Sequence, residues 1–194
     1  MHRLHARSAA FAAAIAVVAT LSSTAWRPLG AQVRVGADSS TRLQRFGRDA
    51  LYGTAEGLAF AVLDQANNDP PEWGSGGAGY KKRALSNVGE FYIQEGVTEG
   101  LAAIMKRPLD YRRCGCRDTG KRIGWALQAS VTDPLPNGTH PIALPRILGV
   151  YAGSFAQASW RPVNGGRSRT SVALLNGTES LGIGFLINLY HEFR

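Results

Sequence analysis

Residues 53–59 read GTAEGLA and residues 96–102 read GVTEGLA, so one pattern of Gly, Glu, Gly and Ala occurs twice. Both stretches lie in segments whose apolar residues recur every three to four positions, which predicts amphipathic helices. A glycine inside a helix costs about 1 kcal/mol relative to alanine. Close approach of two helix backbones offsets such a cost, and small residues spaced by four are the known device for it. The repeat therefore predicts closely packed helices, although two copies of seven residues also fit an internal duplication or chance.

The same spacing of small residues recurs at 149–153 and at 180–184. We expect Gly96 and Gly100 to matter most for packing. On this interpretation Gly96→Leu destabilises the fold by overpacking, by about 1–3 kcal/mol. The glycines expected at interhelical contacts are Gly53, Gly57, Gly89, Gly96, Gly100, Gly149, Gly153 and Gly184.

Clusters of proline and glycine divide the chain into five helical segments. Thr41 is the expected N-cap of the first. In the last segment, the Asn-Gly at 176–177 and alternating apolar residues also fit a hairpin and a strand of an outer-membrane barrel. We favour a helix, because no other segment alternates in this way. The sequence thus predicts an all-α, single-domain bundle of about five helices, at residues 41–66, 79–105, 119–131, 142–160 and 170–193.

The N-terminus has the pattern of a secretory signal peptide. Basic residues precede an apolar run at 9–21, which is too short to span a bilayer. We predict a leader at 1–31, a flexible segment at 32–41 and a helical domain at 42–194. Cleavage after residue 25 and an uncleaved anchor are the alternatives. The arginine-bearing, alanine-rich leader is typical of a bacterial protein, and the prediction is an exported, periplasmic or envelope-associated location.

Charge and composition exclude several classes of protein. The net charge of +8 falls to +5 without the predicted leader, which holds three arginines and no acid. Basic residues are dispersed among acids, whereas nucleic-acid binding favours a denser basic stripe with aromatics. We therefore expect no nucleic-acid partner and interpret the excess as weak attraction to anionic lipid or as solubility. Leu, Ile, Val and Phe supply only 38 of residues 32–194, so small residues must do much of the packing.

Two interpretations of the small-residue pattern stay open at this level. One is a tightly packed soluble bundle, and the other is a set of helices that pack in or against a membrane. Glutamates in the predicted helices oppose full insertion, because each charge is unfavourable at the bilayer centre. The best spanning candidate, 142–160, is barely long enough.

Cys114-Gly115-Cys116 is the most distinctive local motif. In an oxidising compartment neighbouring thiols tend to form a disulfide, and nearby arginines increase thiol reactivity. The usual redox pair has two intervening residues, so a structural disulfide, or pairing to another chain, is preferred over a redox role. A metal site that combines this pair with His140 and His191 matches no standard zinc spacing, and we assign no metal and no cofactor.

Other candidate chemistry is weaker. Glu56, Glu99 and Glu179 could meet in a bundle, but no Glu-x-x-His motif accompanies them. The glycines at 74–79 lack the Gly-Lys-Ser/Thr ending of a phosphate loop, and we interpret the stretch as a flexible loop. Pro70, Pro71 and Trp73 form a candidate partner loop. We assign no catalytic residue.

The sequence therefore favours a non-enzymatic cell-envelope protein, associated with a membrane surface or an envelope partner through glycine-rich helices. The first alternative is an envelope redox or hydrolytic enzyme that uses Cys114 and Cys116 or Glu56 and Glu99. The second is a small protein related to outer-membrane barrels. The oligomeric state is not predicted.

Overall fold

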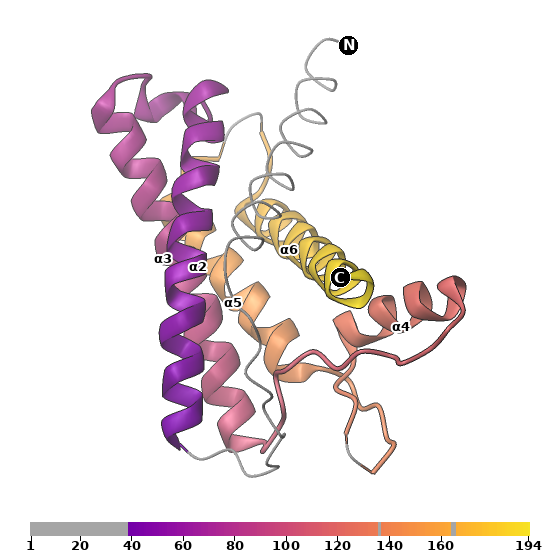
Figure 1. The fold of residues 1–194 in the computed structure, drawn as a ribbon. Coiled ribbons are helices and arrows are strands. Elements are labelled where there is room, and N and C mark those ends of the chain that lie inside the picture. The colour runs from indigo at the N-terminus through magenta and orange to yellow at the C-terminus, as the bar shows by residue number, and fades with distance from the viewer. Residues whose placement is uncertain (1–38, 136, 164–165) are drawn as a thin grey trace. The chain divides into compact units, whose positions relative to one another are not determined.

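The computed structural model describes residues 39–135, 137–163 and 166–194 (Figure 1). The predicted leader at 1–31, and residues 32–38 of the predicted flexible segment, lie outside the described residues. Within the described chain there are five α-helices, one short 3-10 helix and no strand, which confirms the all-α prediction. The elements are α2 (Ser39–Ala66), η1 (Pro71–Trp73), α3 (Gly77–Ile104), α4 (Thr119–Val131), α5 (Leu144–Trp160) and α6 (Arg169–Phe193).

Local signals explain most of the helix ends. α4 has the predicted bounds, and the Asp118 side chain caps it by accepting a hydrogen bond from the Lys121 backbone N–H at 2.8 Å. α2 ends at Ala66 as expected, before the Asn67–Pro70 turn. It begins at Ser39, however, so Thr41 lies inside the helix and the expectation of a cap at Thr41 is wrong. Residues 39–41, which we expected to belong to a flexible segment, are therefore part of α2.

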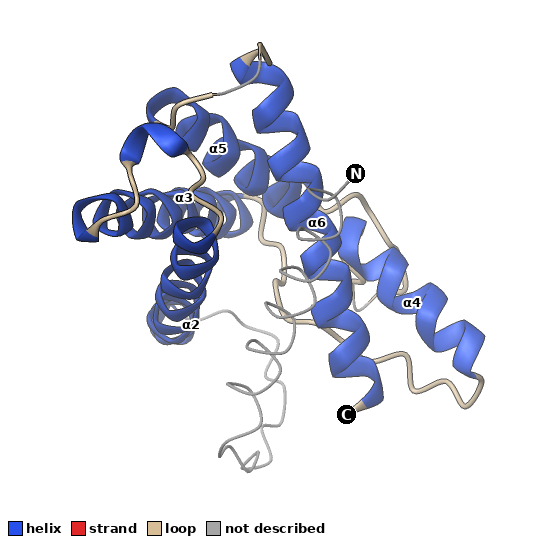
Figure 2. Cartoon of the chain, turned by 90° about the horizontal axis from the view of Figure 1, so that it is seen from above, coloured by secondary structure: helices blue, strands red, loops and turns tan. Residues whose placement is uncertain are grey.

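The last segment is the helix α6, so the alternative of a strand is wrong and the barrel alternative loses its basis. Ser168 caps α6 by accepting from the Ser171 backbone N–H at 3.0 Å. α6 packs against both α4 and α5 and lies between them (Figures 1 and 2). A helix covered on two sides carries apolar residues around most of its circumference, which also produces an alternating pattern.

The chain divides into two compact units that meet between Val88 and Gly89, inside α3. In the first unit, α2 packs on the first turns of α3, where the Asn87 side-chain amide donates to Asp64 at 3.1 Å. In the second unit, α5 packs on the rest of α3 and on α6, and α4 packs on α6. The single domain predicted over 42–194 stays a prediction.

Small residues occupy the buried positions of both units. The buried apolar residues are eight alanines and Val150. Among the residues whose burial is described, no Leu, Ile, Met, Phe, Tyr or Trp is buried, and Leu51, Leu85 and Ile104 are 75%, 74% and 79% exposed. This confirms that small residues do the packing, and it leaves the large apolar side chains at the surface.

Only α6 among the described helices is long and apolar enough, by length and composition, to cross a membrane. The sequence-based candidate at 142–160 is therefore not the best one. α5 has 17 residues, because it begins at Leu144 rather than at Ile142. A spanning helix needs about 20.

Candidate functional site

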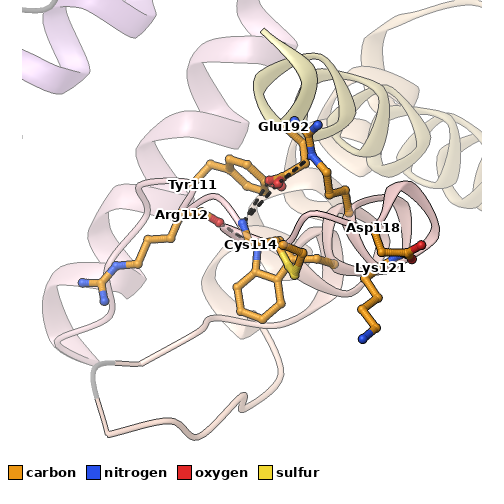
Figure 3. Close-up of polar contacts among 9 residues, drawn as sticks. Tyr111, Arg112, Cys114, Asp118, Lys121 and Glu192 are labelled. Atoms are coloured by element: carbon orange, nitrogen blue, oxygen red, sulfur yellow. Dashed lines mark hydrogen bonds and ion pairs between the residues drawn. A yellow bond between two sulfur atoms is a disulfide. The ribbon is translucent and has the colours of Figure 1, made fainter.

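The most connected polar cluster of the second unit surrounds Glu192, in the last turn of α6 (Figure 3). Its side chain is 2% exposed and accepts a hydrogen bond from the Tyr111 hydroxyl at 2.7 Å. The backbone N–H of Cys114 donates to both of its oxygens, at 3.2 and 3.1 Å. Arg122 Nε lies 3.5 Å from Glu192 Oε1, and the Arg122 guanidinium covers the Phe193 ring at 4.1 Å. One carboxylate thus joins α6, α4 and the loop that carries the cysteines.

The surroundings of Glu192 keep it ionised. Burial by itself raises the pKa of Glu192, but the hydrogen bonds from Tyr111, Cys114 and Arg122 outweigh it, so the pKa lies below its ordinary value. Burial, and then the hydrogen bond to Glu192, raise the pKa of Tyr111, which therefore stays protonated and donates. A carboxylate held by three donors is a poor general base. The arrangement favours a structural anchor.

Trp125 in α4 fixes the same loop at a second point. Its indole N–H donates to the Arg112 carbonyl at 2.7 Å, and its ring meets the His140 ring edge-on at 5.3 Å between centroids. Cys114, whose backbone Glu192 holds, forms a disulfide with Cys116, and their Cα atoms are 5.0 Å apart. Of the two interpretations that the sequence left open, a disulfide within the chain and pairing to another chain, this bond corresponds to the first. Neither sulfur is a free thiol.

A second buried carboxylate, Asp133, has different surroundings. It is 1% exposed, neither of its oxygens has a hydrogen-bond partner, and its nearest cation is Arg146, with Nη2 to Oδ1 at 3.9 Å. Arg146 donates instead to the Ala129 carbonyl at 2.7 Å. Burial raises the pKa of Asp133 and lowers that of Arg146. Sequence reasoning missed this pair, because Asp133 precedes a proline and looked like part of a turn.

In the first unit, Arg83 is fully buried and organises the loop between α2 and α3. Its guanidinium donates to the carbonyls of Asp69, Gly74 and Pro70 at 2.9, 2.6 and 2.7 Å. It also donates to the side-chain oxygens of Gln65 and Asn68 at 2.6 and 3.2 Å. In the stretch 74–79, which we interpreted as a flexible loop, Gly74 is thus held by Arg83, and residues 77–79 belong to α3. In the candidate partner loop, Pro70 is buried, Trp73 is half-buried and only Pro71 is exposed. Whether this loop binds a partner stays a prediction.

Four glycines lie where a side chain would collide with a neighbouring helix. A Cβ at Gly57 would lie 3.0 Å from Val88, and one at Gly153 would lie 2.8 Å from the Glu90 carbonyl. A Cβ at Gly149 would overlap the Thr98 hydroxyl and lie 2.7 Å from the Gln94 carbonyl. Gly177, which we did not select, faces the Tyr151 ring at 2.5 Å. Tertiary packing thus leaves no room for a side chain at Gly149 and Gly153, as the spacing suggested, and only a tight fit against Val88 at Gly57.

Most of the other glycines that we selected from the sequence do not lie in such close contacts. No described atom lies within 4 Å of a Cβ built at Gly96, Gly100 or Gly184, so no neighbour within the described chain requires glycine there. The expected overpacking by Gly96→Leu has no basis in these contacts. A Cβ at Gly89 would meet only Trp160, at an ordinary 3.8 Å. Gly53 is buried. Spacing alone does not determine which face of α3 meets another helix.

The remaining candidate carboxylates are not brought together within either unit. Glu56 belongs to the first unit and Glu99 to the second, and burial raises the pKa of Glu56. Glu179 is exposed. Over the described ranges, no group of three or more His, Cys, Asp or Glu side chains is placed to hold a metal ion. Comparison with protein-family models, curated proteins and solved structures finds no match for the chain.

Proposed function

We propose that this chain is a non-catalytic, exported helical protein that works by attaching apolar helix surfaces to a membrane of the cell envelope. One observation carries the proposal. The described buried apolar residues are alanines and one valine, while eighteen large apolar side chains are more than two-fifths exposed. Soluble proteins expose single apolar residues, but a large exposed apolar area marks an interaction site.

The packing of the helices supports the same function. Gly57, Gly149 and Gly153 allow backbones to approach without large side chains between them. Helices that associate in a lipid environment use small residues in this way, because lipid already covers the large ones. The signal-like N-terminus supports export to a compartment with such a membrane.

Fractionation of the producing cells tests the proposal. We expect the chain in the membrane fraction, retained after a high-salt wash, because salt screens exposed charges but not apolar contacts. Purified chain should also float with lipid vesicles on a density gradient. Recovery only in the soluble fraction, together with no vesicle binding, would contradict membrane attachment.

The redox alternative has a specific observation in its favour, the Cys114–Cys116 disulfide. Thiol titration with and without reductant tests it. Thiols that appear only under strong reductant, with no exchange with small disulfides, support a structural bond. Rapid exchange would support an envelope redox protein instead.

A further inference from the structure

Helix α4 has one broad apolar side, and the described chain covers only part of it. Ala126, Ala129 and Ser130 are buried, and Ser130 accepts a hydrogen bond from Asn188 of α6 at 3.0 Å. The adjoining side carries Ile123, Leu127 and Val131, spaced by four and exposed by 42%, 56% and 44%. A solvent-facing helix side is normally polar. The exposed part of this apolar side therefore indicates a surface that something else covers.

The apolar side of α4 continues onto the chain that follows. Thr132 pairs with Ile142 in an isolated antiparallel bridge, and the Ala143 backbone N–H donates to the Val131 carbonyl at 2.9 Å. This pairing holds Ile142, which is 59% exposed, next to the end of α4. Ile123, Leu127, Val131 and Ile142 are called the α4 apolar face below.

The segment that leads into α4 carries the positive charge of the chain. Residues 106–122 contain seven Lys and Arg against two Asp, whereas the rest of residues 32–194 contains twelve of each sign. One of the two acids, Asp118, is engaged as the cap of α4. The exposed cations of this segment are Lys106, Arg113, Arg117 and Lys121.

Glu192 and Trp125 fix this basic segment against α6 and α4, so its cations are presented from an ordered backbone. Figure 3 shows the side chains of Arg112 and Lys121 extending away from the Glu192 cluster. Lys121 shares the exposed half of α4 with Leu127. Lys121 therefore lies with Ile123 and Leu127 on the exposed part of α4, and Arg117 directly precedes the Asp118 cap of this helix.

We propose that the α4 apolar face and the basic segment 106–122 together form a docking surface for a membrane that contains anionic lipid. This inference rests on the membrane attachment proposed above and names its surface and lipid class. Apolar side chains enter the boundary between headgroups and acyl chains, and cations beside them contact anionic headgroups. Isoleucine, leucine and valine offer no stacking platform for bases, which favours lipid over nucleic acid as the source of negative charge.

Vesicle flotation with the full chain tests the surface. Vesicles of phosphatidylcholine alone are compared with equimolar phosphatidylcholine and phosphatidylglycerol. One charge variant is R113Q/R117Q/K121Q, with K81Q/K82Q/R167Q as the matched control of three exposed cations elsewhere. One apolar variant is I123S/L127S, with A66S/A103S, at two exposed alanines outside the set of large apolar side chains, as its control. All variants share one N-terminus, so differences between them do not report on it.

We expect binding to anionic vesicles to exceed binding to neutral ones and to fall with added salt. A basic residue near an anionic surface contributes on the order of fivefold in affinity, so the charge variant should lose at least about tenfold. The apolar variant should lose binding to both vesicle types, and both controls should bind nearly as the parent does. The double variant R113K/R117K, which keeps Lys121 and all three positive charges, should retain anionic binding. Circular dichroism of each variant checks its fold.

Four outcomes overturn the inference. Equal binding to neutral and anionic vesicles, or equal losses in test and control variants, would reject this surface while leaving membrane attachment intact. Preference for a polynucleotide over anionic vesicles would assign the basic segment to nucleic acid. Absence of binding to every vesicle would reject the attachment itself. If a glutamine variant does not fold, the parent chain still tests the role of charge. Its binding to anionic vesicles must then fall with added salt, and binding that does not change with salt would reject that role.

Discussion

Glu192, at the end of α6, accepts the backbone N–H of Cys114 at 3.1 Å across 78 positions of sequence. The bond joins the last helix to the loop that holds the disulfide. An acid in the last turn of a helix is unfavourable next to the helix dipole. Its presence there is explained by the donors from Tyr111, Cys114 and Arg122 that surround it.

Glu192→Gln should destabilise the second unit. The substitution keeps the side chain's shape but places an amide among donors and leaves Arg122 without its buried partner, for a loss of about 2–3 kcal/mol. Urea unfolding followed by circular dichroism measures it. Glu179→Gln, at an exposed position of the same helix, is the control and should change stability little. Equal effects of the two substitutions would argue against the anchor.

The parent chain should lose stability in acid through Glu192. Because the folded-state pKa lies below the unfolded value, the contribution is complete above roughly pH 4.3 and is lost as the pH falls through the folded pKa. Urea midpoints measured from neutral to acidic pH should fall more steeply for the parent than for the Glu192→Gln variant. Parallel curves for both proteins would show that this carboxylate contributes nothing to acid sensitivity.

Arg146→Gln should destabilise the chain at neutral pH by about 2–3 kcal/mol, because it leaves Asp133 as an uncompensated buried charge. Burial raises the pKa of Asp133, so the folded state binds this proton more tightly than the unfolded chain does. The loss should therefore shrink as the pH falls and Asp133 becomes neutral. Asp133→Asn is the control and should change stability by less than about 1 kcal/mol, since the carboxylate makes no hydrogen bond.

Gly149→Ala and Gly96→Ala form a matched pair: we expect the first to lower the stability of the chain and the second to raise it. At Gly149 the new methyl group overlaps Thr98 and crowds the Gln94 carbonyl, so we expect a loss of about 1–3 kcal/mol. At Gly96 nothing in the described structure opposes the methyl group, and removal of a helical glycine should add about 0.5–1 kcal/mol. Thermal unfolding of both variants measures the difference. Destabilisation at Gly96 would indicate a close contact that the described chain does not contain.

Arg83→Lys should loosen the loop between α2 and α3. Lysine keeps the charge but cannot reproduce five hydrogen bonds that a planar guanidinium makes to fixed carbonyl and amide oxygens. We expect faster amide exchange and earlier proteolytic cleavage within residues 69–77. Lys82→Arg, at an exposed neighbouring position, should leave both unchanged.

Local rules predicted the helices better than they predicted their contacts. α4 has its predicted bounds because Asp118 and the following turn act within a few residues. α6 could not be separated from a strand on alternation alone, since burial on two sides erases the helical period. We predicted that α2 begins at Thr41, but the helix begins two residues earlier, at Ser39.

The sequence by itself determined that this chain is helical, where most helices end, and that small residues would be buried. These properties depend on propensity, capping and turn chemistry between near neighbours. Only the tertiary structure decided that Gly149 and Gly153 are contacts while Gly96 and Gly100 are not, and that Glu192 holds Cys114. Such pairings depend on which helix faces meet, and residues far apart in sequence carry no local signal of that choice.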